Sequence, residues 1–135
     1  MTTGGCQCGQ VRYEFSGDPF NAVFCYCTEC QTRTGGDKWF GLWARHANFS
    51  FLAGHEPATY ARKGASGKDV LHHYCPTCGV NVCANITAGG FYTVAATSVD
   101  GGWPRKPKAA IYTASAQSWA VLPTDVPVFE ALPPM

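Results

Sequence analysis

The chain has 135 residues, of which 46% are hydrophobic and 14% are charged, and its formal net charge is +1. A chain of this length is expected to form one domain with a real hydrophobic core, and its near-neutral charge argues against nucleic-acid or anionic-membrane partners. The start, MTTGGCQCGQ, has neither a basic region nor an apolar stretch, and no run of about 18 apolar residues occurs. We therefore expect a soluble cytoplasmic protein with a single domain, residues 1–135.

Short runs of alternating apolar and polar residues favour β-strands over helices along most of the chain. In VRYEF, for example, Val11, Tyr13 and Phe15 alternate with polar residues. Turns rich in glycine, proline, aspartate and serine separate such runs. The predicted strands are residues 11–15, 48–52, 58–62, 70–74, 80–86, 91–99 and 109–114.

The rest of the chain gives little sign of helix. One helical turn is expected at residues 28–34. The tail, residues 121–135, contains prolines that disfavour both helix and central strand, so it should wrap the domain as extended chain. The predicted fold class is mainly β, a single domain of short antiparallel strands.

Eight cysteines, seven of them in close groups, are the most informative feature of the sequence. Thiols in a reducing compartment stay reduced unless they are catalytic or bind a metal, so disulfides are a second choice. The groups follow C-x-C, C-x-C-x-x-C and C-x-x-C spacing, at which sulfurs can face one tetrahedral zinc ion but seldom form relaxed disulfides. The cysteines are Cys6, Cys8, Cys25, Cys27, Cys30, Cys75, Cys78 and Cys83.

Two of these groups are predicted to form one closed, structural zinc site. Cys6 and Cys8 precede the first predicted strand, and Cys75 and Cys78 belong to a CPTCG turn between two later strands. Proline and threonine inside C-x-x-C, followed by glycine, are typical of a zinc knuckle whose backbone N–H groups face the thiolates. The site would join distant parts of the chain, so its binding free energy becomes folding free energy.

The remaining triplet, Cys25, Cys27 and Cys30, supplies three of the four ligands of a tetrahedral ion. Three protein ligands and an open fourth position distinguish catalytic zinc from structural zinc. Three thiolates on Zn²⁺ leave one net negative charge, which makes the ion a poor activator of water but suits an incoming thiol. The triplet therefore predicts a catalytic zinc site for making or breaking carbon–sulfur bonds, and the chain is expected to bind two zinc ions.

Three other residues have both a functional and a structural interpretation. Cys83 could complete the zinc site of the triplet, but a lone cysteine in an apolar run is more typical of a small buried side chain. Strand alternation sends His72 and His73 to opposite faces, so at most one can face a metal. A position beside a ligand or at the surface is favoured for both over ligation.

Basic and aromatic residues also occur close to the triplet. Arg33, Lys38 and Arg45 could bind a substrate carboxylate, although exposed basic side chains usually only solvate a surface. The aromatic residues of this stretch are expected either in the core or in a pocket wall; they are Trp39, Phe40 and Trp43.

Three motifs, GGCQCGQVRYEF, CYCTECQTRTGG and HYCPTCGVNV, resemble in order and spacing the glutathione-dependent formaldehyde-activating enzymes and the CENP-V-like proteins. The resemblance continues weakly through FYTVAATSVD, KPKAAIYTASAQSW and DVPVFEALP, and so covers nearly the whole chain. It implies a β-tent fold with two zinc ions. The implied ligands are Cys6, Cys8, Cys75 and Cys78 for the structural ion, and Cys25, Cys27 and Cys30 for the catalytic one.

The reaction implied by the resemblance is the condensation of glutathione with formaldehyde to S-hydroxymethylglutathione, and its reversal as a carbon–sulfur lyase. Two positions depart from the family's pattern, because Tyr26 and Ala110 stand where many members have histidine. The chain also lacks obvious insertions that would build a dedicated glutathione pocket. Other thiols and aldehydes therefore stay open as substrates.

Three classes of function are open at this point. The first is a zinc-dependent lyase or synthase that acts on a thiol and an aldehyde. The second is a non-catalytic zinc-binding module for a partner, which a basic patch or an exposed aromatic platform would support. The third is a thiol–disulfide redox protein that uses C-x-x-C, although the βαβ context of such proteins is missing.

Overall fold

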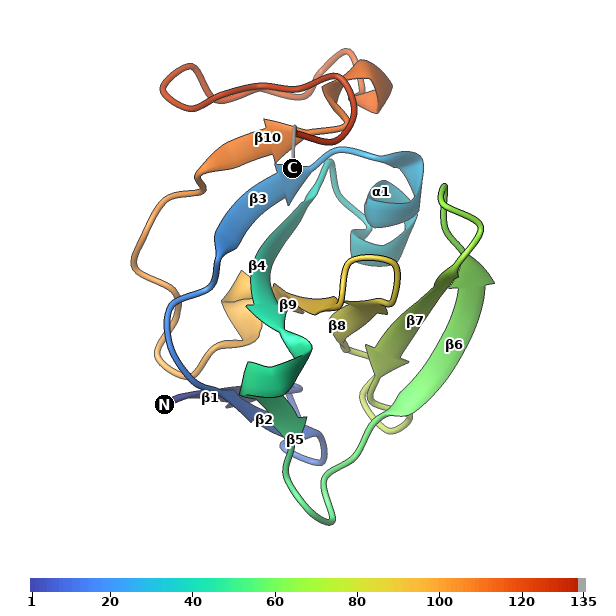
Figure 1. Ribbon diagram of the computed structural model, residues 1–135, viewed down its shortest axis with the longest axis vertical. Coiled ribbons are helices and arrows are strands. Elements are labelled where there is room, and N and C mark those ends of the chain that lie inside the picture. The colour runs from blue at the N-terminus through green and yellow to red at the C-terminus, as the bar shows by residue number, and fades with distance from the viewer. Residues whose placement is uncertain (134–135) are drawn as a thin grey trace.

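Two β-sheets of unequal size form the framework of the computed structural model, which describes residues 1–133 (Figure 1). Within these residues the small sheet has the order β1-β2-β5, and the large sheet has the order β10-β3-β4-β9-β8-β7-β6. The strands are β1 (Thr2–Gly5), β2 (Arg12–Phe15), β3 (Asn21–Cys25), β4 (Trp39–Arg45), β5 (Phe49–Phe51), β6 (Ala58–Lys63), β7 (Asp69–Tyr74), β8 (Asn81–Ile86), β9 (Phe91–Ala95) and β10 (Ala109–Ile111). The helical segments are α1 (Thr28–Thr34) and the 3-10 turns η1 (His46–Asn48), η2 (Ala96–Ser98) and η3 (Thr113–Ser115).

The mainly β prediction is confirmed, and each predicted strand corresponds to one of β2 and β5 to β10. The helix lies at the predicted residues, Thr28–Thr34. Two predicted strands are too long, since β9 ends at Ala95 and β10 at Ile111, and a 3-10 turn follows each. β1, β3 and β4 have no counterpart among the predicted strands. Pairing is antiparallel as expected, except that β10 adds to β3 in parallel.

The large sheet separates two clusters of apolar side chains, because successive residues of a strand point to opposite faces. In β4, Leu42 belongs to the cluster shared with the small sheet, whereas Trp43 belongs to the other one. The first cluster contains Tyr13 and Phe49 and forms the core between the sheets. The second includes Cys25, with the other two cysteines of the triplet packed against it. The triplet therefore lies on the face away from the small sheet.

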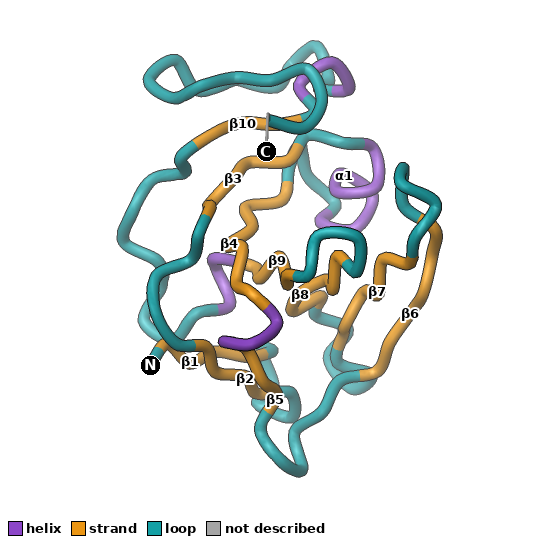
Figure 2. The backbone as a smooth tube through the Cα atoms, viewed as in Figure 1, coloured by secondary structure: helices purple, strands orange, loops and turns teal. Residues whose placement is uncertain are grey.

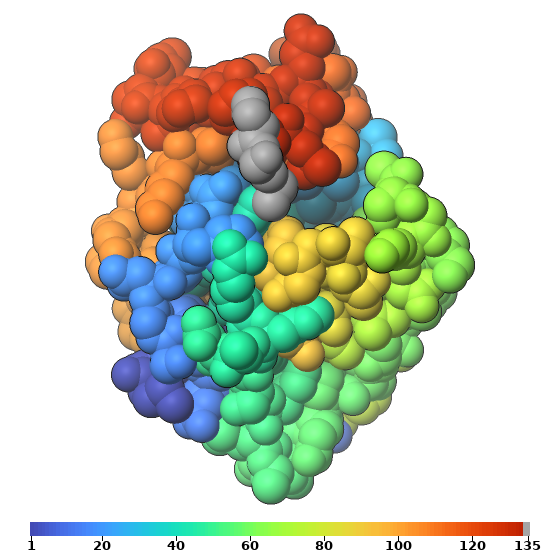
Figure 3. Space-filling model, viewed as in Figure 1, coloured from blue at the N-terminus to red at the C-terminus, as the bar shows by residue number. Residues whose placement is uncertain are grey.

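The chain after β10 crosses one end of the molecule as an irregular strap (Figures 2 and 3). Ala110 ties this strap to the large sheet, because its N–H donates to Pro127 O and its carbonyl accepts from Phe129 N, both at 2.9 Å. Residues 121–133 wrap the domain without helix or regular strand, as predicted, although bends interrupt the expected extended chain; residues 134–135 lie outside the described part. No helix within residues 1–133 has both the length and the apolar composition needed to cross a membrane.

Gly41 in β4 lies beneath a contact between two neighbouring side chains, in which Trp39 Nε1 donates to Thr93 Oγ1 at 3.0 Å. A Cβ atom at Gly41 would overlap both of these groups. We predict that Gly41→Ala lowers the free energy of unfolding by about 1–3 kcal/mol, the usual cost of overpacking, as measured by urea denaturation. Gly36→Ala is the control, because the nearest atom to its Cβ is Thr34 Oγ1 at 3.8 Å. Equal stability of both variants and the wild type would contradict this packing.

Candidate metal centres and active-site cavity

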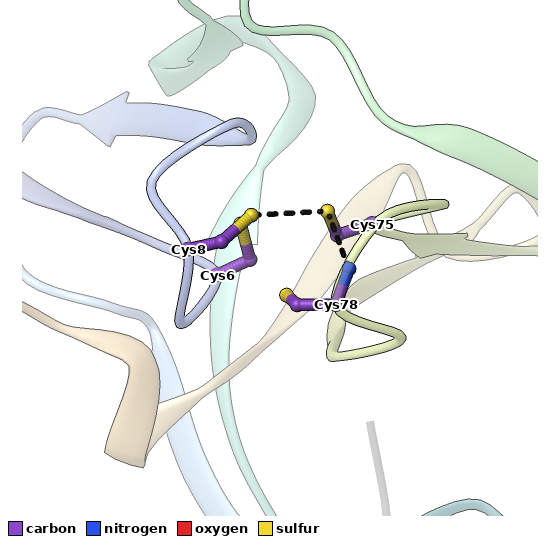
Figure 4. A group of neighbouring side chains, drawn as sticks. All are labelled: Cys6, Cys8, Cys75 and Cys78. Atoms are coloured by element: carbon purple, nitrogen blue, oxygen red, sulfur yellow. Dashed lines mark hydrogen bonds between the residues drawn. The ribbon is translucent and has the colours of Figure 1, made fainter.

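Four cysteines from two distant turns point toward a common centre (Figure 4). Cys6 and Cys8 lie in the turn between β1 and β2, and Cys75 and Cys78 lie in the turn between β7 and β8. All four sulfurs lie within 4.8 Å of one another. The Cys6–Cys8 and Cys8–Cys75 sulfur separations are both 3.7 Å. The predicted grouping of these cysteines is therefore confirmed, and we call them the four-cysteine group.

The geometry of the four-cysteine group fits a zinc ion. Sulfurs arranged tetrahedrally at a Zn–S distance of about 2.3 Å lie about 3.8 Å apart, close to the separations above. Backbone N–H groups of Thr77 and Cys78 point at Cys75 Sγ, each at 3.4 Å. Hydrogen bonds from the backbone of Val80 and of Cys8 lower the pKa of the Cys78 thiol to about 6. These N–H groups favour thiolates, as the knuckle motif predicts.

The triplet forms the second group, with its three sulfurs also within 4.8 Å of one another. Cys25 ends β3, Cys27 is the N-cap of α1, and Cys30 lies in the first turn of that helix. The Cys27 sulfur accepts a hydrogen bond from Cys30 N at 3.3 Å, and Gly35 ends the helix in the left-handed conformation. The short helix thus begins and ends at defined residues. Within residues 1–133 this group has three members, one fewer than the four-cysteine group.

Crowding couples the ionisation of the three thiols. Hydrogen bonds from Cys25 and then Cys30 lower the pKa of Cys27 to about 2. The hydrogen bond to Cys27 raises the pKa of Cys25 to about 12, and hydrogen bonds with Cys25 and then Cys27 raise the pKa of Cys30. Cys27 is therefore the sulfur of the triplet that ionises most readily. A divalent cation would allow the other two to ionise as well, because a coordinated thiol is deprotonated outright.

A cavity of about 360 Å³ lies beside the triplet, and all three of its cysteines line it. This volume falls within the range of about 300–1,000 Å³ that is typical of small-molecule sites. Trp39, Trp43 and Phe91, from the paired strands β4 and β9, form an apolar wall. A small molecule in the cavity would therefore contact both sulfur atoms and aromatic rings.

Charged and polar side chains on the cavity form a connected network of Glu29, Arg33, Arg62 and His72. Arg33 Nε and Arg62 Nε lie 3.1 and 3.3 Å from the same carboxylate oxygen, Glu29 Oε1. Arg62 Nε also donates to His72 Nε2 at 2.9 Å. Burial, followed by the charges of Arg33 and Arg62, lowers the pKa of His72 to about 4, so this imidazole is neutral at pH 7. Two guanidinium groups and one carboxylate leave one net positive charge near the triplet.

Of the three basic residues considered from the sequence, only Arg33 belongs to the cavity lining. Lys38 pairs with Asp37 at 3.1 Å, and Arg45 packs over the ring of Phe20 at 3.9 Å. A carboxylate-binding role for Lys38 and Arg45 therefore has no support from their positions.

The aromatic residues Trp39, Phe40 and Trp43 lie on both faces of β4, so the core and the pocket-wall interpretations are each correct for part of this set. Trp39 and Trp43 form part of the cavity wall. Phe40 packs against the core cluster and against Phe24, with ring centroids 5.0 Å apart.

His72 and His73 lie on opposite faces of β7, as alternation predicts. His72 lines the cavity, whereas His73 contacts Phe51 of the small sheet with ring centroids 5.3 Å apart. Both are buried, so the surface alternative is wrong for each. Cys83 belongs to neither cysteine group and is only 2% exposed, which confirms its interpretation as a small buried side chain, and burial raises the pKa of its thiol.

Two positions that depart from the family's pattern, Tyr26 and Ala110, do not line the cavity in the described part of the chain. Tyr26 and Ala110 are both fully buried. The Tyr26 hydroxyl donates to Val121 O at 3.4 Å and so contacts the C-terminal strap. Neither side chain therefore supplies a polar group to the cavity beside the triplet.

Two cavity residues, Arg62 and Tyr112, have no functional prediction from the sequence. Arg62 looks like an ordinary exposed position of a strand, and only strand pairing brings it to the triplet. Tyr112 falls within a predicted strand, but its backbone is left-handed, with φ 54° and ψ 36°. Burial, followed by the nearby Cys25 and Cys27, raises the pKa of the Tyr112 hydroxyl. The left-handed backbone of a tyrosine cannot be predicted from the periodicity of apolar and polar residues.

Metal content should distinguish the two cysteine groups. We predict two zinc ions per wild-type chain, one per folded Cys30→Ala chain, and two in the control Cys83→Ala, measured by elemental analysis and circular dichroism. Cys75→Ala should abolish folding, because structural zinc contributes about 10–16 kcal/mol of binding free energy. Two zinc ions in Cys30→Ala, or a stably folded Cys75→Ala, would contradict these roles.

Comparison with known proteins places the chain in a family. A family model described as "Glutathione-dependent formaldehyde-activating enzyme" matches residues 1–115, which contain all eight cysteines. A crystal structure of a Rhodobacter sphaeroides protein shares the fold, with a TM-score of 0.58, 24% identity, and coverage of 76% of this chain and 92% of that one. No match was found among curated protein sequences. The chain belongs to the family of glutathione-dependent formaldehyde-activating enzymes.

Proposed function

We propose that the protein is a zinc-dependent carbon–sulfur lyase or synthase that joins a thiol such as glutathione to an aldehyde such as formaldehyde. Family membership supports these two reactants. The observation that carries the proposal is the position of the triplet, whose three sulfurs line a cavity of about 360 Å³. Within residues 1–133 no member of the four-cysteine group lines this cavity, which supports a structural role for that group.

The donor set of the triplet fits zinc, since cysteine thiolates are among the ligands that bind this ion in proteins. Cys25, Cys27 and Cys30 would hold the ion, which supplies a fourth position where a thiol is kept as thiolate. In the forward reaction the thiol sulfur bonds to the carbonyl carbon, the C=O double bond becomes a single bond, and the proton lost by the thiol ends on the oxygen. Nothing is oxidised or reduced, and the reverse reaction breaks the same carbon–sulfur bond.

The aromatic wall keeps water from the reacting atoms. Trp43 and Phe91 are almost fully buried, and their rings stack with centroids 4.5 Å apart. Water competes with the thiol for the aldehyde carbon, so an apolar wall favours sulfur attack over hydration.

The net positive charge of the arginine network supports binding of a thiol that carries a carboxylate. Arg33 and Arg62 direct their Nε atoms to Glu29, and each guanidinium has further N–H donors. Glutathione has carboxylates at both ends, and one of them can neutralise the excess charge while its sulfur reaches the triplet. Bidentate pairing with arginine also fixes orientation.

We place this reaction in the cytoplasm, where glutathione is abundant and thiols stay reduced. The eight cysteines are free thiols in the structure, which agrees with such a location.

Catalysis is tested by ¹³C exchange NMR on glutathione and formaldehyde at equilibrium with their adduct. Zinc-loaded wild-type protein should accelerate the interconversion, and the control Ser50→Ala, at an exposed position of the small sheet, should match it. Cys27→Ser should fall to the uncatalysed rate, because serine does not replace a thiolate ligand. A Cys27→Ser variant with full zinc content and full turnover would contradict the proposal. No acceleration by the wild type would favour a non-catalytic zinc-binding module.

The carboxylate site is tested by Arg62→Gln, with the exposed Arg105→Gln as a matched control. We predict that Arg62→Gln raises KM for glutathione by roughly tenfold, because a hydrogen bond to a charged group contributes about 1.5–3 kcal/mol. KM for the neutral thiol 2-mercaptoethanol should stay unchanged in both variants. An equal rise for both thiols would show that Arg62 supports the cavity without binding a carboxylate.

A further inference from the structure

Tyr112 is the single residue other than glycine with a positive φ in residues 1–133. Left-handed backbone is unfavourable for a bulky side chain and persists only where the surroundings enforce it. Here the backbone is held on both sides, because Tyr112 N donates to Ala131 O and Ser115 N donates to Tyr112 O, each at 3.1 Å. Such strain is concentrated at functional sites in proteins.

The strained turn directs the side chain of Tyr112 into the cavity. In a continuing strand, Ile111 and Tyr112 would point to opposite faces. The left-handed residue breaks this alternation, and both side chains line the cavity. Ile111 is paired with Cys25 across β10 and β3, and Tyr112 packs against the cluster that contains this cysteine. The turn therefore brings a phenol group to the triplet.

The Tyr112 hydroxyl is available to a ligand, since the hydrogen bonds of Tyr112 within residues 1–133 are made by its backbone. Several other polar groups on the cavity already have hydrogen-bond partners within the described residues. Thr93 accepts from Trp39, and Asn81 donates to Arg33 O at 3.3 Å. The carboxylate of Glu29 is held by the arginine network.

The proposed reaction needs a hydrogen-bond donor at the aldehyde oxygen. Attack of the thiol sulfur puts negative charge on the aldehyde oxygen, and a donor fixed at that oxygen stabilises the transition state more than the reactants. We infer that the Tyr112 hydroxyl donates this hydrogen bond and is a catalytic residue. This inference rests on the proposed function. The proton lost by the thiol still ends on the oxygen of the adduct, and Tyr112 keeps its own proton over the cycle.

The first test compares zinc-loaded Tyr112→Phe with the wild type. The variant should lose about 100-fold in kcat, the usual effect of removing one donor to a developing oxyanion. KM for glutathione, zinc content and the urea midpoint should not change, because phenylalanine keeps the ring and the strained turn. Tyr92→Phe is the matched control, a half-buried tyrosine that packs against the core cluster on the other face, and it should keep full kcat.

The second test detects the hydrogen bond itself in protein labelled with ¹³Cζ-tyrosine. The Tyr112 resonance is assigned as the one that is absent from the spectrum of Tyr112→Phe. Its chemical shift should change when formaldehyde is added to the zinc-loaded, glutathione-bound wild type, and should not change with glutathione alone. Full kcat in Tyr112→Phe, or a loss of kcat without movement of this resonance, would overturn the inference while the proposed function stands. A wild type that does not accelerate the reaction would overturn both.

Discussion

Sulfur atoms within 4.8 Å of one another can all ionise only around a cation, because thiolates repel each other at this distance. Both cysteine groups are built on this constraint. The four-cysteine group links Cys8 to Cys75 across 67 residues of chain and joins a turn of the small sheet to a turn of the large sheet. Binding of one zinc ion there would have a free energy comparable to the whole stability of a domain, about 5–15 kcal/mol. With zinc bound there, as we propose, the attachment of the small sheet would depend on the metal as well as on the shared core.

The triplet is subject to the same constraint, but it lies on the opposite side of the large sheet and lines a cavity. Its helix, α1, carries Cys30 and also Glu29 and Arg33, which anchor the charged network. Residues three positions apart, such as Cys30 and Arg33, are neighbours on one helix face. One short element therefore fixes the spacing between the sulfurs and the positive charge. Under the proposed function, this spacing would select a thiol that carries its carboxylate at a matching distance.

The sequence predicts the two cysteine groups because the ligands of each pair are close together in the chain, and turn residues such as those of CPTCG report directly on the local structure. It also predicts α1, which begins at the cap residue Cys27 and ends at Gly35. β3 and β4 are not predicted, because both strands have apolar residues on both faces and so show no alternation of apolar and polar residues. β1 escapes because two of its four residues are glycine, which has low strand propensity. The cavity and the position of Arg62 are not predicted, because pairing between distant strands leaves no local sequence pattern. Tyr112 is not predicted, because a positive φ leaves none either.

The most direct test of the central claim is the ultraviolet spectrum of cobalt-substituted protein during titration with glutathione. Sulfur-to-cobalt charge transfer reports how many thiolates surround the metal. If the triplet holds a metal that can accept a thiol, the band should grow and saturate at one glutathione per chain. A protein that binds one cobalt ion per chain, or a band that does not change at saturating glutathione, would contradict the account.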